Sequence, residues 1–166
     1  GYPASQTLVV SFWGSLGAST MNRQMLDFFR REKEDGFPFY HIHAAGSGSW
    51  EWMQQELQQA GLTGQNRLDV RQYIYDMAVV MRAADLVICR AGASTISEIT
   101  ALAVPAVIVP SPYVANDHQE KNARILAQHG GACLIHETEC SGEKLYQTTR
   151  DILDSPTRRD SMSRGM

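Results

Sequence analysis

The sequence contains only three cysteines among 166 residues, Cys89, Cys133 and Cys140, at spacings that fit neither a disulfide framework nor a zinc site. We therefore expect reduced thiols in a cytosolic protein, with Cys89 and Cys133 as small core residues because both lie in apolar runs. An excess of positive charge is also absent, since 18 acidic residues against 15 Lys and Arg give a net charge of −3. This balance disfavours nucleic acid or an anionic membrane surface as a partner.

Long apolar runs are missing as well, because none approaches the roughly 20 residues that span a bilayer, and no signal peptide opens the chain. No Walker motif, nucleophile elbow, HExxH or Ser/His/Asp order is present. The chain starts at Gly1 without a methionine and stops at Met166 with no closing element after residue 160. We therefore expect residues 1–166 to be one domain cut from a longer protein.

What the sequence does contain is a regular alternation of short apolar runs and longer amphipathic stretches. We predict strands buried on both faces at 8–12, 39–43, 68–74, 85–89, 106–109 and 132–135. We predict helices at 19–33, 50–60, 76–84, 95–103, 118–128 and 142–153. The order is typical of an α/β protein with a Rossmann-like, doubly wound parallel sheet of about six strands.

Ligands of such folds bind beyond the carboxyl ends of the strands, so the loops there matter most. Residues 14–17 (GSLG) follow the first strand and are either a tight turn or a phosphate-binding turn that uses Ser15 and the amides near Gly17. Their spacing is not GxGxxG, which disfavours a dinucleotide. Residues 45–48 (AGSG) are more simply a turn.

Residues 89–98 (CRAGASTISE) lead from the fourth strand into a helix. Thr95 with Glu98 three residues later matches a capping box, in which Thr95 is the N-cap and contributes about 1 kcal/mol of helix stability. The same helix start would hold a diphosphate, with Glu98 accepting hydrogen bonds from ribose hydroxyls. Spacing alone favours the cap, whereas the matching loops favour ligand contacts. The two roles can alternate between the empty and the filled site.

Residues 116–122 (NDHQEKN) are a polar run that opens a helix, either as a solvated first turn capped by Asn116 or Asp117 or as a set of contacts to sugar hydroxyls. His118 and Asn122 share a helix face, and no second ligand at metal spacing accompanies His118. His41 and His43 alternate in a strand, and we interpret both as core or edge residues.

Five segments together closely resemble, in order, the C-terminal domain of the MurG glycosyltransferases, which have the GT-B fold and belong to glycosyltransferase family 28. The segments are residues 14–18, 73–78, 84–98, 105–110 and 117–123. Members of this family transfer GlcNAc, with inversion, from UDP-GlcNAc to undecaprenyl-pyrophosphoryl-MurNAc-pentapeptide, which converts lipid I to lipid II in peptidoglycan synthesis.

The resemblance implies a UDP-GlcNAc site in this chain. Ser15 and the amides near Gly17 would face the α-phosphate, and the backbone of Ile74 with Met77 would receive uracil. The remaining implied contacts are Gly92, Ala93, Ser94 and Thr95 to diphosphate and sugar, Glu98 to ribose, and His118, Gln119 and Asn122 to GlcNAc. The family commonly has glycine where Phe12 or Trp13 stands, glutamine at Leu16 and, in some members, glutamine at His118.

The resemblance further implies no metal, no cofactor besides the donor and no catalytic residue in this chain, so the isolated domain would bind UDP-GlcNAc without turnover. The family's N-terminal domain supplies the base and the lipid-linked acceptor site. That domain also holds the full-length protein at the cytoplasmic face of the membrane as a peripheral protein. Two alternatives stay open. One is a single-domain subunit of a lipid-linked GlcNAc transferase, and the other is a non-catalytic nucleotide-sugar-binding module or scaffold. A UDP-sugar epimerase is disfavoured because its carboxylate and histidine set is not apparent.

Overall fold

The structure is a computed structural model that describes residues 6–114 and 117–166. Six strands form one parallel sheet in the order β3-β2-β1-β4-β5-β6. The strands are β1 (Leu8–Phe12), β2 (Tyr40–Ala44), β3 (Leu68–Arg71), β4 (Leu86–Cys89), β5 (Ala106–Ile108) and β6 (Ala132–Leu134). The predicted fold class is confirmed, and each observed strand overlaps a predicted one, although β3 ends before Ile74.

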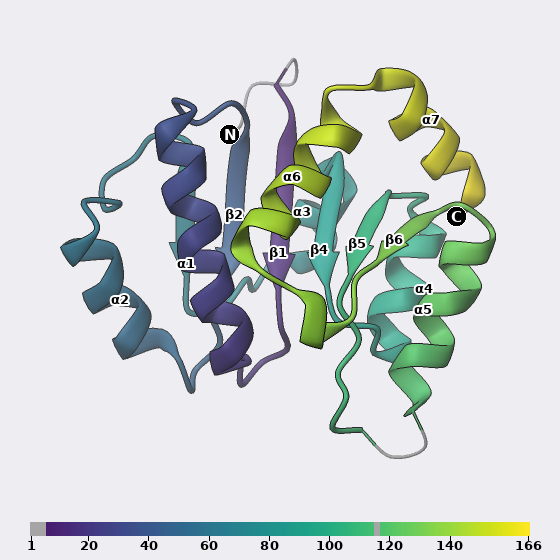
Figure 1. Cartoon of the computed structure of the whole chain (residues 1–166), viewed down its shortest axis with the longest axis horizontal. Helices are drawn as coiled ribbons and strands as arrows, with labels where there is room; N and C mark the ends of the chain where they lie inside the picture. The colour runs from purple at the N-terminus through teal and green to yellow at the C-terminus, as the bar shows by residue number, and fades with distance from the viewer. Residues whose placement is uncertain (1–5, 115–116) are drawn as a thin grey trace.

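Helices cover both faces of the sheet (Figure 1). One layer contains α1 (Ser19–Glu34), α2 (Trp50–Gln59), α6 (Gly142–Leu153) and α7 (Pro156–Gly165). The other contains α3 (Met77–Ala83), α4 (Ala93–Ala101) and α5 (His118–Gln128). No helix of the described residues is long and apolar enough to cross a membrane.

The expectation of no closing element after residue 160 is wrong, because α7 continues to Gly165. Pro156 occupies its first turn, where a missing N–H costs nothing, and the Ser155 hydroxyl accepts a hydrogen bond from the Arg158 amide as a cap. Met162 is the one buried residue recorded for this helix. Without an apolar stripe, the sequence carries no periodic signal for α7.

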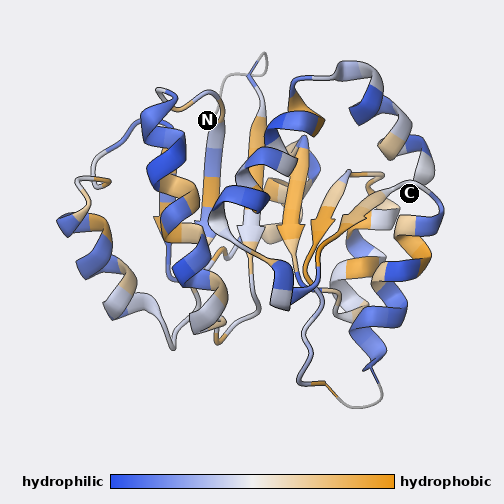
Figure 2. Cartoon of the chain, viewed as in Figure 1, coloured by the Kyte–Doolittle hydropathy of each residue, from blue (hydrophilic) through white to orange (hydrophobic). Residues whose placement is uncertain are grey.

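The core lies on both sides of the sheet, since successive strand residues point to opposite faces. In β1, Val10 packs toward α3–α5 and Val9 packs toward α1. Helix α1 buries Met21, Met25 and Phe28 completely, as its periodicity predicts. Figure 2 shows the result as apolar strands between helices with polar outer faces.

The order of the strands places a switch point between β1 and β4. The chain proceeds from β1 through β2 to β3 on one side, and from β4 through β5 to β6 on the other. Because the connections leave these two strands in opposite directions, a crevice opens at their carboxyl ends. These ends lie at the bottom of Figure 1.

Candidate functional site

A cavity of about 470 Å³ lies at this crevice, over the carboxyl ends of β1 and β4. Eight of the predicted site residues line it, namely Ser15, Ile74, Met77, Gly92, Ser94, Thr95, Glu98 and Gln119. Gly17 lines an adjoining cavity of about 430 Å³, which shares Trp13, Arg90 and Gln119 with the first. A larger groove of about 730 Å³ between α2 and β3 contains none of the predicted residues.

The first loop, residues 14–18, follows β1 and is shaped by two glycines with positive φ, +93° at Gly14 and +78° at Gly17. A Cβ on Gly17 would overlap the carbonyl oxygen of Ala45. Both this close contact and the positive φ therefore require a glycine at this position. The turn exposes Ser15 and leads into α1, whose N-cap has no side-chain hydrogen bond. Backbone amides at such a helix start attract anions.

Helix α4 begins at Ala93, with Gly92 as the N-cap, and no side chain caps it. The predicted capping box is therefore wrong, because the N-cap lies three residues before Thr95, and the first helical turn closes through a hydrogen bond from the Ile96 amide to the Gly92 carbonyl. Thr95 is the third residue of the helix, and Glu98 lies in its middle. Both residues line the cavity.

The stretch after β3 forms the end of the cavity predicted to receive uracil. Ile74 is 1% exposed and Met77 is half-buried at the start of α3. Tyr73 and Tyr75 stand beside them with ring centroids 5.0 Å apart, and Tyr75 is 92% exposed. A flat heterocycle here would meet an apolar wall and the backbone of Ile74, and the uracil contact stays a prediction.

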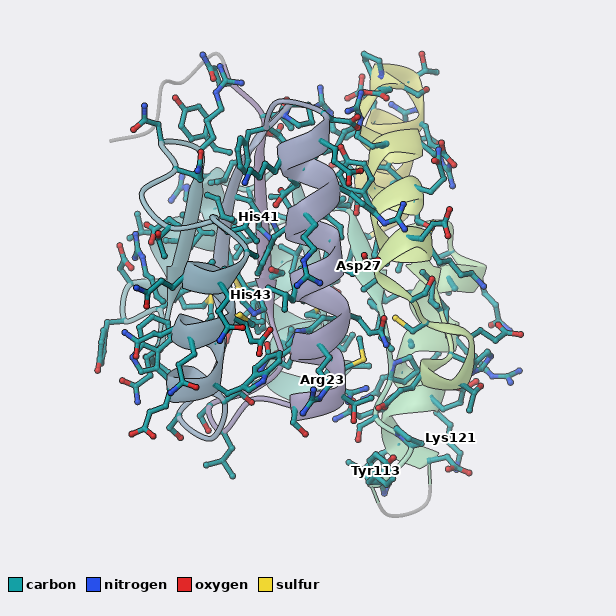
Figure 3. The ribbon with its side chains drawn as sticks, turned by 60° about the vertical axis from the view of Figure 1, so that its left-hand side comes forward. Arg23, Asp27, His41, His43, Tyr113 and Lys121 are labelled. Carbon is teal, nitrogen blue, oxygen red and sulfur yellow. The ribbon has the colours of Figure 1, made fainter. Side chains whose placement is uncertain are left out.

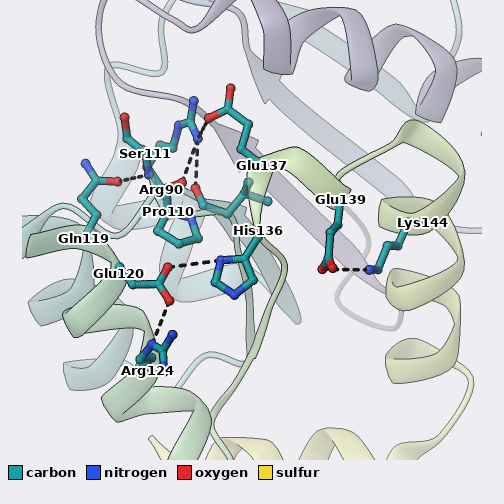
Figure 4. Close-up of polar contacts among 11 residues, drawn as sticks. Arg90, Pro110, Ser111, Gln119, Glu120, Arg124, His136, Glu137, Glu139 and Lys144 are labelled. Carbon is teal, nitrogen blue, oxygen red and sulfur yellow. Dashed lines mark hydrogen bonds and ion pairs between the residues drawn. The ribbon is translucent and has the colours of Figure 1, made fainter. Parts of the chain in front are cut away.

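Two of the predicted sugar contacts, Gln119 and Asn122, hold the backbone of Ala91 in this structure. The Gln119 Oε1 accepts hydrogen bonds from the amides of Ala91 (3.2 Å) and Ser111 (2.9 Å), the second of which is drawn in Figure 4. The Asn122 Nδ2 donates to the Ala91 carbonyl at 3.1 Å. Gln119 lines both cavities, whereas Asn122 is among the lining residues of neither.

The two remaining predicted contacts, Ala93 and His118, are exposed at the starts of α4 and α5. Asp117 occupies the N-cap position of α5, as the capping alternative predicted, but with a left-handed φ of +53° its side chain makes no cap hydrogen bond. Asn116, the other predicted cap, lies outside the described residues.

Arg90 is a central residue of the site that sequence reasoning missed. Its guanidinium forms an ion pair with Glu137 at 2.8 Å and donates to the carbonyls of Val109 and Pro110 (Figure 4). It also lies 5.8 Å from the ring centroid of Trp13, a cation–π arrangement. Arg90 thus connects the ends of β1, β4 and β5. Its position directly after a buried strand was the feature of the sequence from which it could have been predicted as a site residue.

The thiol beneath the crevice is held in its neutral form. Burial raises the pKa of the Cys89 thiol, beneath the crevice, to about 12, so this group is not a nucleophile. Among residues 6–114 and 117–166, no cluster of three or more His, Cys, Asp or Glu could hold a metal ion. The first loop and the start of α4 remain the segments predicted to bind phosphate.

Comparison with known proteins agrees with this geometry, since the family model of the glycosyltransferase family 28 C-terminal domain matches residues 8–166. The chain belongs to this family. A curated transferase of Acetivibrio thermocellus, named UDP-N-acetylglucosamine–N-acetylmuramyl-(pentapeptide) pyrophosphoryl-undecaprenol N-acetylglucosamine transferase, is 38% identical over 99% of this chain. A protein of the same name from Halalkalibacterium halodurans is 35% identical over 98% of it.

Solved structures place the family 28 domain within a wider fold. The crystal structure of Acinetobacter baumannii MurG matches 99% of this chain with a TM-score of 0.77 and 28% identity. The C-terminal CMP-Kdo-binding domain of WaaA from the same organism matches 98% with a TM-score of 0.73 at 9% identity, a likeness of fold alone. The chain spans 43% of the Acetivibrio relative and 45% of the MurG chain.

Proposed function

We propose that this family 28 domain binds UDP-GlcNAc as the donor half of an inverting GlcNAc transferase that acts on undecaprenyl-pyrophosphoryl-MurNAc-pentapeptide. The observation that carries the proposal is one cavity lined by a glycine turn, a helix start and a carboxylate, represented by Ser15, Thr95 and Glu98. These groups match the phosphates and the ribose hydroxyls of a nucleoside diphosphate. The names of the relatives supply the sugar and the acceptor.

The domain's contribution to the reaction is electrostatic. The acceptor's MurNAc 4-hydroxyl attacks the anomeric carbon of GlcNAc from the face opposite the diphosphate, and the bond from that carbon to the diphosphate oxygen breaks. UDP leaves with the electron pair, and amides of the first loop and of the α4 start stabilise the charge that grows on it. The proton of the attacking hydroxyl passes to a base from another part of the full-length enzyme.

The lipid-linked acceptor and the membrane belong to the proposal for the whole protein. Since the chain spans less than half of its relatives, the acceptor site is assigned to the remainder. The full-length protein would then work at the cytoplasmic face of the membrane as a peripheral enzyme. UDP-GlcNAc is the donor, and neither nucleic acid nor a metal ion takes part.

Isothermal titration calorimetry tests the proposal directly. The chain should bind UDP and UDP-GlcNAc with one site, and CDP more weakly because a cytosine presents a different edge to the Ile74 backbone. Incubation of the isolated chain with UDP-GlcNAc and acceptor should release no UDP. A flat titration with both uridine ligands up to millimolar concentration would refute the donor-site assignment.

A further inference from the structure

A chain of five buried polar side chains crosses the core between α1 and the sheet. The Oε1 of Glu32 lies 2.8 Å from the Nδ1 of His41, whose Nε2 lies 2.7 Å from the Oγ of Ser11. The same hydroxyl lies 2.7 Å from the Nδ1 of His43, whose Nε2 lies 2.9 Å from the Oδ1 of Asn22. All five side chains are at most 1% exposed, and Figure 3 shows the two histidines alongside α1.

Such a chain is costly in an α/β core. Each buried polar group loses its water, and well-packed apolar side chains of similar volume would stabilise the same layer at least as well. The aromatic rings of Phe28 and Phe29 already surround His41, each with its centroid 5.3 Å from the imidazole. Packing alone therefore does not account for these polar residues. The groups at which this row of hydrogen bonds ends, Asn22 and the Ala45 carbonyl, give the better explanation.

The hydrogen bonds run in one direction. Asn22 donates from Nδ2 to the Ala45 carbonyl at 2.7 Å, so its Oδ1 accepts from the Nε2–H of His43. Burial holds the pKa of His43 well below its ordinary value, so its ring is neutral and its Nδ1 accepts from the Ser11 hydroxyl. The Ser11 oxygen in turn accepts from the Nε2–H of His41. Every donor thus points toward Ala45.

Ala45 belongs to a second loop, residues 45–49, that contacts the first loop through its backbone. Its carbonyl oxygen occupies the space where a side chain of Gly17 would lie. The amide of Ser47 donates to the Ser15 carbonyl at 3.1 Å, and the amide of Gly48 donates to the Leu16 carbonyl at 3.0 Å. The second loop is therefore a backbone template for the turn that presents Ser15.

We propose that His43 is a positioning residue of the donor site, which acts through Asn22 and the Ala45 carbonyl to set the geometry of the first loop. The inference rests on the proposed function in one respect, that the first loop contacts the donor phosphate. A displaced template would move the Ser15 hydroxyl and the Gly17 amide away from the phosphate oxygens. Small displacements of such groups weaken binding strongly.

Two substitutions of His43 separate positioning from packing. His43→Phe keeps an aromatic ring but removes both nitrogens, whereas His43→Gln keeps a donor near the Nε2 position for Asn22. We expect His43→Phe to weaken UDP binding about tenfold, by analogy with the loss of hydrogen bonds that orient the ligands of a metal site. His43→Gln should bind UDP with nearly the wild-type affinity. Ser11→Ala, a smaller change in the same chain, replaces His43→Phe if that variant does not fold.

A second measurement does not depend on the ligand. The amide resonances of Gly17 and Gly46 in the ligand-free protein should shift in His43→Phe and return toward wild type in His43→Gln. The matched control is Ile152→Val on α6, which creates a small cavity in the apolar cluster that also contains Phe28 and Phe29. It should leave both glycine resonances unchanged. Unmoved glycine resonances in folded His43→Phe or Ser11→Ala would overturn the inference. If the wild type binds no UDP, the proposed function fails, while the resonances still decide the positioning role.

Discussion

Arg90 and Glu137, 47 residues apart in the sequence, form an ion pair of 2.8 Å whose side chains are only 12% and 9% exposed. The pair joins the end of β4 to the segment after β6, and both residues line the smaller cavity of about 430 Å³. Because it is largely shielded from water, removing one partner leaves a charge without compensation. It therefore matters more than the many ion pairs on the surface of this protein.

Glu137→Ala should lower the free energy of unfolding by about 2–3 kcal/mol, somewhat less than for a fully buried pair. Urea unfolding followed by circular dichroism measures the change. The matched control is Glu139→Ala, two residues later, whose ion pair with Lys144 is longer (3.7 Å) and exposed. That control should change stability by less than about 0.5 kcal/mol. Equal effects of the two substitutions would show that the buried ion pair contributes no more to the free energy of unfolding than the exposed one.

Glu98→Gln should weaken UDP binding by about tenfold or more, because a carboxylate accepts two ribose hydroxyls better than a neutral amide. The melting temperature should stay unchanged, since α4 begins at Ala93 and Glu98 caps nothing. Calorimetry with 2′-deoxy-UDP sharpens the test. The wild type should lose affinity for the deoxy ligand, whereas Glu98→Gln should hardly distinguish the two. A lower melting temperature with unchanged UDP affinity would restore the capping interpretation.

Gln119→Glu should separate the two roles of this side chain. A carboxylate can still accept hydrogen bonds from the amides of Ala91 and Ser111, so the fold and its stability should persist. The substitution removes the Nε2 donor, however, and with it the proposed contact to GlcNAc. We expect the preference for UDP-GlcNAc over UDP to disappear, measured as the ratio of the two dissociation constants. An unchanged ratio would exclude the sugar contact of Gln119.

The fold was predictable because local pattern and burial agree in most of the chain. Strands such as β4 are apolar throughout and lie between helices of clear periodicity, so their order followed from the sequence. Helix α7 was not predicted from the sequence because it buries only Met162 and therefore has no apolar stripe. The start of α4 was predicted two residues too late because the Thr95–Glu98 pattern resembles a capping box, whereas the helix begins after Gly92, which is its N-cap.

The candidate site was predictable only as far as its loops. Ser94 and Thr95 are neighbours in sequence and come shortly after β4, so their place at the crevice could be predicted from the sequence. Arg90 and Glu137 meet only after β4, β5 and β6 have assembled, and no spacing announces that contact. The alternation of His41 and His43 showed a shared face, but their partners Glu32 and Asn22 come from α1 and depend on tertiary packing.

The Glu32–His41 pair predicts how stability depends on pH. Burial raises the pKa of Glu32 well above 4.5 and lowers that of His41 from 6.5 to about 3, and the folded pair thus retains one proton, on the carboxyl. The neighbouring groups are the neutral His43, the Ser11 hydroxyl and aromatic rings, which add no charge. Between pH 4.5 and 6.5 the unfolded pair also holds one proton, so the pair contributes no slope there.

Above pH 6.5 the unfolded pair has lost its proton while the folded pair keeps one, so stability should fall as pH rises, by up to about 1.4 kcal/mol per pH unit. Glu32→Gln, which can donate to His41 without titrating, should remove this alkaline slope. Urea unfolding at pH 6.5, 7.5 and 8.5 measures it, and Glu34→Gln, an exposed carboxylate on the same helix, serves as the control that retains it. Parallel curves for wild type and Glu32→Gln would mean that the folded pair holds no proton above pH 6.5. In that case Glu32 would be an unprotonated carboxylate facing a neutral imidazole.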